Sequence, residues 1–242
     1  MKIICLHHAG GNGFRFYSWK KHLEGYQVFT LDLPGHGSRI QEPLLYDFDM
    51  VVHELTQQVV LKTEDDEAYV LFGHSMGGLM ILHILDQLEE QGKRMPEGVI
   101  LSGASVPEEC PNRKKVKDMS EDEFLNMVYE QGGTSREIME TEEFRECFLP
   151  IIRADYTVLD EKKLLHRTEK FTVKAVIFNG EEDLGARGQE EKLKTYFEGQ
   201  VPVVHFKGGH FYFDQQVSFV CEQIRNYIEK NFREECIHAT AY

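Results

Sequence analysis

Short apolar runs alternate with longer amphipathic stretches along most of the chain. Six runs have the length and composition of buried strands: 3–6, 27–31, 69–72, 99–101, 175–178 and 203–206. The segments between them are long enough for helices, and this alternation is typical of a mostly parallel sheet covered by helices on both faces. We therefore predict an α/β fold.

Two of the intervening segments show the spacing of amphipathic helices. In the first, which follows residue 76, leucines recur at helical intervals: Leu79, Leu82, Leu85 and Leu88. The second, 215–232, places apolar side chains on one face: Val217, Val220, Cys221, Ile224 and Ile228. We expect both helices to pack against the sheet.

The strand pattern disappears between residues 103 and 172, where charged helical sequence takes its place. Ser120 followed by Glu123 is typical of a capping box, and Thr141 before two glutamates is a second helix-start signal. We predict a single α/β domain over residues 1–242 with a helical lid insertion at about 104–172. The alternative is an extra helical layer without a gating role.

Ser75 lies in the segment YVLFGHSMGGLM, between the apolar run 69–72 and the helical segment that begins at Met76. Gly73 and Gly77 complete the pattern Gly-x-Ser-x-Gly, in which a strained strand-to-helix turn exposes the serine hydroxyl above the sheet. A serine can instead cap a helix by accepting a backbone hydrogen bond, but that role leaves both glycines unexplained. We therefore predict that Ser75 is a nucleophile.

A nucleophilic serine requires an imidazole to accept its proton and an acid to orient that imidazole. His210, in FKGGHFYFD, follows the run 203–206 and lies on a loop beyond a strand end, where catalytic groups collect. The acid should lie in FNGEEDLG, after the strand that ends at residue 178. Position alone leaves Glu181, Glu182 and Asp183. Asp183 is our first choice because it is short and lies farthest into the loop, and Glu182 is the second.

Attack on an acyl carbonyl creates an oxyanion that backbone N–H donors stabilise. The amide of Met76, directly after the serine, is one expected donor. The segment HHAGGNGF, residues 7–14, follows the first strand and is rich in small residues, so we assign the second donor to the amide of Ala9. Loss of one such donor typically costs roughly 3 kcal/mol of transition-state stabilisation.

Two glycine-containing segments allow other interpretations. Gly11 and Gly13 would need a third glycine at position 16 to form a dinucleotide fingerprint, but Phe16 stands there. DLPGHGSR, residues 32–39, contains an aspartate and a histidine, yet its Pro-Gly and His-Gly pairs are typical of turns, so we interpret it as structural. No cysteine, histidine or carboxylate spacing indicates a metal site, and we expect none.

Composition narrows the class of protein further. The chain has 242 residues, 41% of them hydrophobic, which is enough for a sizeable core. A net charge of −14 disfavours nucleic acid and anionic membranes as partners. Neither a signal-peptide pattern nor an apolar run of membrane-spanning length occurs, and the five scattered cysteines indicate reduced, mostly structural thiols. We expect a cytoplasmic protein.

A series of motifs extends these observations over almost the whole chain: HHAGG, DLPGHGSR, FGHSMGG, LSGAS with PNRKK, FLPIIRADY, FNGEED and GGHFYF. In this order the chain resembles the stand-alone (type II) thioesterases of nonribosomal peptide and polyketide synthesis, including those of the surfactin type. These are α/β hydrolases with a helical lid. The resemblance implies Ser75 as nucleophile, Asp183 as acid and His210 as base, with the Ala9 and Met76 amides as oxyanion donors.

The chain departs from this pattern at two places. His7 and His8 stand where surfactin-type relatives carry a proline and an aromatic residue, and Thr134 and Ser135 follow a Gly-Gly pair where a proline often lies nearby. Both departures concern the expected shape of the acyl pocket and leave the predicted triad intact.

The resemblance implies hydrolysis of acyl, aminoacyl or peptidyl thioesters on the phosphopantetheine arm of acyl or peptidyl carrier proteins, through an acyl-enzyme that water resolves. The enzyme would need no cofactor of its own, because the carrier brings the arm. Met1 directly precedes the first strand, so we expect a separate, monomeric enzyme rather than a domain behind a carrier. The alternatives are an esterase or lactonase for small free substrates and an inactive interaction module.

Two further sets of residues are assigned to binding. The densest basic cluster lies in the predicted lid, where we expect it to contact the carrier or its phosphate: Arg113, Lys114, Lys115 and Lys117. A solvated loop is the alternative for this cluster. Phe14 and Phe211, with Met76, are expected to line the substrate pocket, and ordinary packing is the alternative for these side chains.

Overall fold

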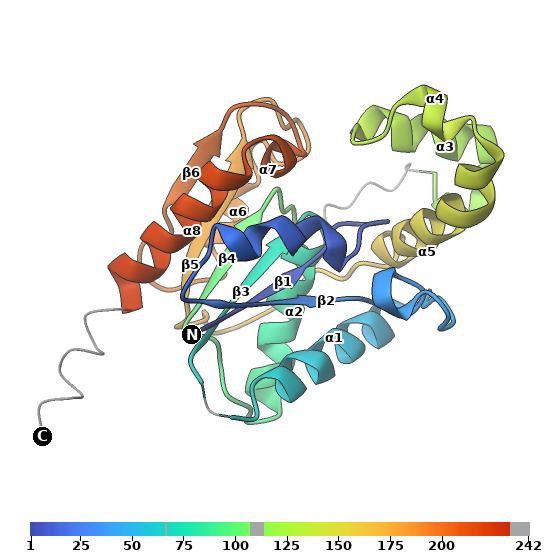
Figure 1. Ribbon diagram of the computed structural model, residues 1–242. Coiled ribbons are helices and arrows are strands. Elements are labelled where there is room, and N and C mark those ends of the chain that lie inside the picture. Colours follow the sequence, from blue (N-terminus) through green and yellow to red (C-terminus); the bar gives the residue numbers. More distant parts are fainter. Residues whose placement is uncertain (66, 107–113, 233–242) are drawn as a thin grey trace, which may run out of the picture.

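The computed structural model describes residues 1–65, 67–106 and 114–232 (Figure 1). Within these residues the six predicted strands form one parallel sheet in the order β2-β1-β3-β4-β5-β6. The strands are β1 (Lys2–Leu6), β2 (Gln27–Leu31), β3 (Tyr69–His74), β4 (Gly98–Ser102), β5 (Lys174–Gly180) and β6 (Val203–Phe206). The α/β prediction is confirmed.

The direction in which strands are added to the sheet reverses between β1 and β3. The chain places β2 on one side of β1 and then returns to place β3 on the other side. Ligands of open α/β sheets bind beyond the carboxyl ends of the strands at such a reversal. The loop 7–12 follows β1 and Ser75 follows β3, so both lie at this point of the sheet.

Helices cover both faces of the sheet. Helices α1 (Phe48–Lys62) and α2 (Met76–Glu90) pack on one face, and the 3₁₀ helix η1 (Gly13–Lys21) and α8 (Val217–Phe232) pack on the other (Figure 1). The alternation of side chains along a strand explains the two layers, since Ile4 belongs to the first apolar cluster and its neighbour Ile3 to the second. The hydrophobic core therefore consists of two layers of side chains, one on each face of the sheet.

The predicted helices differ from the structure mainly at their ends. The first extends to Glu90 at its carboxyl end, and the last begins at Val217 rather than at residue 215, because Tyr212–Gln215 forms a separate turn, α7. Two further short elements are η2 (Gly37–Arg39) and α6 (Glu190–Lys194). No helix in the described part of the chain is long and apolar enough to cross a membrane.

Between β4 and β5 lies a group of helices that we call the lid segment: η3 (Val116–Asp118), α3 (Glu121–Gln131), α4 (Arg136–Met139), η4 (Phe144–Phe148) and α5 (Leu149–Asp160). These helices share an apolar cluster of their own around Phe124 and Leu149. Ser120 and Glu123 form the predicted capping box, and the Thr141 hydroxyl accepts a hydrogen bond from the Phe144 amide. That this segment opens and closes stays a prediction.

The junction between β3 and α2 depends on glycine. A Cβ atom on Gly77 would lie 2.5 Å from the carbonyl oxygen of Leu6, at the end of β1. A Cβ atom on Gly73 would lie 2.7 Å from the amide nitrogen of Gly78. Backbone atoms on both sides cannot move aside without disturbing the sheet, so the absence of these side chains lets α2 begin directly against the strand ends.

We expect Gly77→Ala to lower the free energy of unfolding by about 1–3 kcal/mol, because the added methyl group collides with the backbone of β1. Urea denaturation of parent and variant measures this change. Gly209→Ala is the matched control, since a Cβ atom there would meet no heavy atom within 4 Å. Equal destabilisation by the two substitutions would contradict the explanation.

Candidate active site

Ser75 has a strained backbone at the start of α2, with φ of 54° and ψ of −113°. It is the one non-glycine residue with positive φ in the described part of the chain. Its amide donates a 2.8 Å hydrogen bond to the carbonyl oxygen of Ser102 at the end of β4. The side chain forms no capping hydrogen bond, so the alternative role as a helix cap is excluded.

His210 is hydrogen-bonded to Asp183, with 2.7 Å between Nδ1 and Oδ2. The other carboxylate oxygen accepts hydrogen bonds from the amides of Gly185 and Ala186 at 3.0 and 3.2 Å. Burial raises the pKa of Asp183, but these bonds and the nearby imidazole outweigh it and lower the pKa below its ordinary value. An ionised carboxylate requires Nδ1–H as the donor, which leaves Nε2 of the neutral ring as a base.

The structure thus brings Asp183 to His210, whereas Glu181 and Glu182 are exposed. Backbone hydrogen bonds explain why Asp183 and not a glutamate reaches His210, because they join the loops after β5 and β6. The amides of the two glutamates donate to the carbonyl oxygens of Phe206 and Gly208 at 2.8 and 3.0 Å. Both glutamate backbones are therefore used to join the loops, and Asp183 is the next residue along.

A buried hydrogen-bond chain lies beneath His210. His74 Nδ1 is 2.8 Å from Ser102 Oγ, which is 2.6 Å from the Tyr212 hydroxyl. Burial lowers the pKa of His74 well below its ordinary value and raises that of Tyr212, so both side chains are neutral. This chain connects the ends of β3 and β4 to the loop that carries His210. Nothing local in the sequence indicates it.

Ser75 and His210 line the same cavity, of about 280 Å³. Four residues of the lid segment also line it: Met127, Gln131, Tyr156 and Leu159. The segment therefore covers the site, as its position between β4 and β5 suggests.

The aromatic residues expected in the pocket lie elsewhere. Met76 lines the cavity, but Phe14 and Phe211 are not among its lining residues. Phe14 is 70% exposed on η1, so its prediction as a pocket residue is wrong. The ring of Phe211 packs against His8, with 5.0 Å between ring centroids. A Cβ atom on Gly133 of the lid segment would lie 2.7 Å from the Phe211 ring, which places this aromatic residue at the contact between lid and sheet.

Both predicted oxyanion donors are available. Met76 is the first residue of α2, and amides in the first turn of a helix have no intrahelical acceptor. In the part of the chain that the structure describes, the amide of Ala9 donates to no other backbone group. These two amides flank the reversal point of the sheet.

The segment 32–39 is a turn, as predicted, but Asp32 also holds the loop after β1. Its Oδ1 accepts a 2.6 Å hydrogen bond from the amide of Gly13, and Oδ2 accepts from the amide and hydroxyl of Ser38. Burial raises the pKa of Asp32, but these bonds lower it overall. His36 in the same turn is hydrogen-bonded to Asp155 of α5. None of these contacts of Asp32, His36 and Asp155 was predicted from the sequence.

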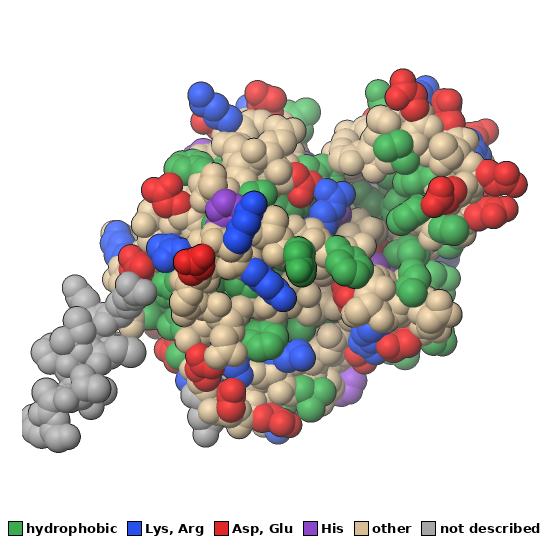
Figure 2. Space-filling view, in the orientation of Figure 1, with side chains coloured by type: hydrophobic (Ala, Val, Ile, Leu, Met, Phe, Trp, Pro, Cys, Tyr) green, Lys and Arg blue, Asp and Glu red, His purple; other side chains and the backbone are tan. Residues whose placement is uncertain are grey.

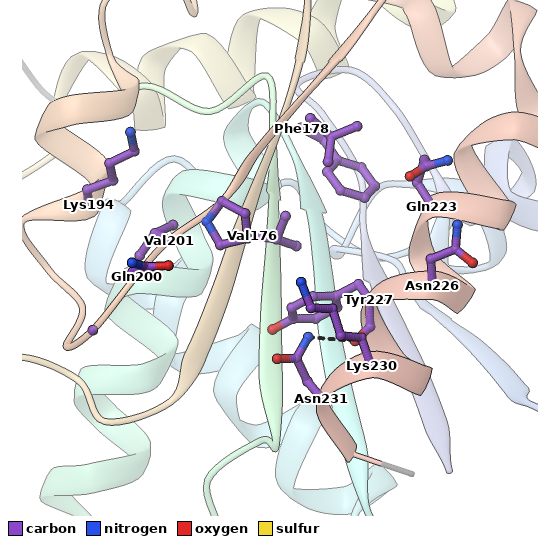
Figure 3. A pocket seen from close by; sticks show the side chains of 13 residues that line it. Val176, Phe178, Lys194, Gln200, Val201, Gln223, Asn226, Tyr227, Lys230 and Asn231 are labelled. Atoms are coloured by element: carbon purple, nitrogen blue, oxygen red, sulfur yellow. Dashed lines mark hydrogen bonds between the residues drawn. The ribbon is translucent and has the colours of Figure 1, made fainter. Parts of the chain in front are cut away.

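A larger cavity of about 760 Å³ lies between β5, β6 and the carboxyl-terminal half of α8 (Figure 3). Amide and lysine side chains such as Gln223, Asn226 and Lys230 line it, and none of the described residues that line it is a histidine, serine, cysteine or carboxylate. Although this cavity is larger than the one at Ser75, its described lining therefore offers no serine–histidine–carboxylate triad for catalysis. Within residues 1–65, 67–106 and 114–232, no group of three or more histidine, cysteine or acidic side chains could hold a metal ion.

The basic cluster is only partly described. Arg113 lies outside the described residues. Lys114 pairs with Glu123 at 2.7 Å, and Lys115 and Lys117 are exposed near η3. Contact with a carrier stays a prediction. Among the described cysteines, Cys5, Cys147 and Cys221 are free thiols.

Comparison with known proteins identifies the family. A family model described as "Thioesterase domain" matches residues 1–228. The chain belongs to the thioesterase family. It is an enzyme that hydrolyses thioesters, and the fold of solved thioesterases agrees with the sheet described above.

Several named proteins are similar to this thioesterase. It is 28% identical to Thioesterase PikA5 of Streptomyces venezuelae over 94% of this chain and 81% of that protein. It is 30% identical to the medium-chain S-acyl fatty acid synthase thioesterase of Homo sapiens over 95% and 86% of the two chains. The structure of ClbQ from the colibactin NRPS/PKS pathway superimposes with a TM-score of 0.86 at 24% identity, covering 95% of this chain and 97% of ClbQ.

Asp183→Asn should lower kcat of the thioesterase for a small activated thioester by about 10⁴, because an amide no longer fixes the His210 tautomer or stabilises an imidazolium. Steady-state kinetics on purified protein measures the loss. The matched control is Glu182→Gln, a change of the same kind at the neighbouring exposed residue, for which we expect parental kcat. A larger loss in the Glu182 variant would contradict the assignment of the acid.

Proposed function

We propose that this thioesterase is an editing (type II) enzyme that removes acyl, aminoacyl or peptidyl groups from the phosphopantetheine arm of carrier proteins. The observation that carries the proposal is the meeting of Ser75 and His210 in one cavity under the lid segment, with His210 bonded to buried Asp183. Among the similar proteins, YbtT is described as a type II thioesterase from the yersiniabactin NRPS/PKS biosynthetic pathway, and AngT of Vibrio anguillarum is named a "probable anguibactin biosynthesis thioesterase".

The proposed reaction has two halves. Ser75 Oγ attacks the thioester carbonyl while Nε2 of His210 accepts its proton, and the resulting oxyanion is held by the amides of Ala9 and Met76. The C–S bond then breaks, and the imidazolium returns the proton to the phosphopantetheine sulfur. Water, deprotonated by His210, attacks the acyl-serine ester. The bond between the acyl carbon and Ser75 Oγ then breaks, the imidazolium returns its proton to Oγ, and the free acid leaves. Asp183 orients the ring and stabilises its charged form throughout.

The enzyme requires no cofactor in this scheme. The phosphopantetheine arm belongs to the substrate carrier protein, and every proton is moved by His210.

Electrostatics restricts where a carrier can dock. Acidic side chains gather over the outer helices of the lid segment (Figure 2), and Glu121, Asp122 and Glu137 are exposed there. The resemblance implies carrier proteins as partners, and these are usually acidic, so this surface repels them. We therefore propose that the exposed Lys115 and Lys117, at the base of the lid segment, provide local attraction.

Intact-mass measurement of acetyl-loaded and aminoacyl-loaded carrier proteins tests the function directly. The parent enzyme should regenerate the free phosphopantetheine thiol, and Ser75→Ala should release no acyl group above the uncatalysed rate. If the parent leaves the carriers loaded but cleaves small activated esters, the enzyme acts on small free substrates and the carrier proposal is wrong.

Reversal of two charges tests the docking proposal. The double variant Lys115→Glu and Lys117→Glu should lower kcat/KM for the loaded carrier by about tenfold at low salt, and leave turnover of a small soluble thioester unchanged. Lys20→Glu with Lys21→Glu, on η1, is the matched control of equal charge. Equal loss on both substrates, or a larger loss in the control, would contradict the proposed surface.

A further inference from the structure

The direction of the Ala9 N–H is set by the carbonyl group that precedes it. In a trans peptide the N–H and the preceding C=O point in opposite directions. The carbonyl oxygen of His8 accepts a 2.8 Å hydrogen bond from the amide of Gly11, and it lies 2.8 Å from Nδ1 of His7. Since a carbonyl can only accept, Nδ1 of His7 carries the proton. Two hydrogen-bond donors, the Gly11 amide and His7 Nδ1, thus fix the orientation of the peptide group between His8 and Ala9.

The next peptide group is held by the lid segment. The amide of Gly10 donates a 2.6 Å hydrogen bond to Oδ2 of Asp155, which lies 145 residues away on α5. Helix α5 also packs directly on the loop, because a Cβ atom on Gly10 would lie 2.5 Å from Cγ1 of Ile152. Gly10 has φ of 72°, a conformation that other residues rarely adopt, so this close approach is built into the loop.

Asp155 is itself held by His36. Their side chains are each 2% exposed, and Nε2 of the imidazole lies 3.0 Å from the same Oδ2. Nδ1 of His36 lies 3.0 Å from the carbonyl oxygen of Pro34. Both partners accept hydrogen bonds, so both ring nitrogens donate and the ring is an imidazolium.

The surroundings of His36 agree with this protonation state. Burial lowers the pKa of His36, but its hydrogen bond to Asp155 and the charges of Asp155 and Asp32 together raise it above the ordinary value. The ring of His7 stacks on His36 at 5.0 Å between centroids, and burial lowers the pKa of His7, so that ring adds no second charge. A single ion pair therefore joins α5 to the turn after β2.

We propose that Asp155, held by His36, is a positioning residue of the oxyanion hole. The carboxylate fixes the Gly10 amide and so the direction of the neighbouring Ala9 N–H, and it makes the hole depend on the packing of α5 against the loop. Movement of α5 away from the sheet would remove the acceptor of the Gly10 amide and relax the loop. The inference rests on the Ser75 chemistry of the proposed function, but not on the identity of the acyl carrier.

A matched pair of substitutions on α5 separates this role from general support of the lid segment. Asp160, on the same helix, also accepts a hydrogen bond from a backbone amide, that of Val116, but this amide belongs to the lid segment itself. Asp155→Asn and Asp160→Asn each replace a carboxylate that accepts a backbone N–H with a neutral amide of similar shape. They differ in which amide the weaker acceptor serves, that of Gly10 in the oxyanion loop or that of Val116 in the lid segment, and in the ion pair with His36 that only Asp155 forms among these two.

With a small soluble thioester, Asp155→Asn should lower kcat by about tenfold to a hundredfold, less than the loss of a whole oxyanion donor, with KM within about twofold of the parent. A boronic acid that forms a tetrahedral adduct on Ser75 should bind more weakly by the same factor. Asp160→Asn should leave both quantities within about twofold. Parental kcat and boronic acid affinity in Asp155→Asn, or equal losses in the two variants, would overturn the proposal.

His36 provides the second test, which decides the matter if Asp155→Asn does not fold. Glutamine can still donate a hydrogen bond to Asp155, whereas alanine cannot. His36→Gln should therefore retain most of the parental kcat, and His36→Ala should show the loss expected for Asp155→Asn. Equal kcat in these two variants would overturn the proposal. The probes are a soluble thioester and a boronic acid. These tests can therefore be interpreted even if the enzyme proves inactive on carrier proteins.

Discussion

The backbone of Ser75 is held in a left-handed conformation, and the rest of the site depends on this constraint. A non-glycine residue in this region costs on the order of 1–3 kcal/mol, which the surrounding structure must offset. It does so where β3 ends against α2, because Gly73 and Gly77 have no side chains to separate strand from helix. The result is a hydroxyl at the carboxyl edge of the sheet, next to the amide of Met76 at the first position of α2.

The remaining chemical groups converge on that edge from distant parts of the chain. Parallel strands end at one edge, so the loops after β1, β3, β5 and β6 lie together there although they are spread over two hundred residues or so of sequence. The buried Asp183 and the chain from His74 to Tyr212 then fix the loop that carries His210. Catalytic geometry of this kind is held by hydrogen bonds between loops, while the apolar core only brings the loops close.

The sequence indicates the features that local patterns encode. Apolar runs predict the strands, and two glycines at fixed spacing predict the turn at Ser75. The choice among Glu181, Glu182 and Asp183 was open by position, because it depends on which backbone amides join the loops after β5 and β6. Phe14 illustrates the limit for apolar residues, since an aromatic side chain near a site can equally face solvent, as it does here.

Long-range polar contacts leave no local pattern. His36 and Asp155 are separated by 119 residues, and each lies in a segment with an adequate local explanation, a turn and a helix. Only the tertiary structure shows that both are buried and share a hydrogen bond with each other. His7 is similar: nothing in its local sequence indicates a role, and the structure gives it a carbonyl partner in the oxyanion loop. Sequence differences near a site thus gain meaning from the peptide groups that they contact.

The proposed reaction requires that Ser75 become acylated during turnover. Rapid acid quenching of the enzyme with a thioester substrate, followed by digestion and mass measurement of the peptides, tests it most directly. We predict the mass of the acyl group on the peptide that contains Ser75, formed within the first turnover and absent from Ser75→Ala. Steady turnover by the parent with no acylated peptide, or with the acyl group on another residue, would contradict the proposed reaction.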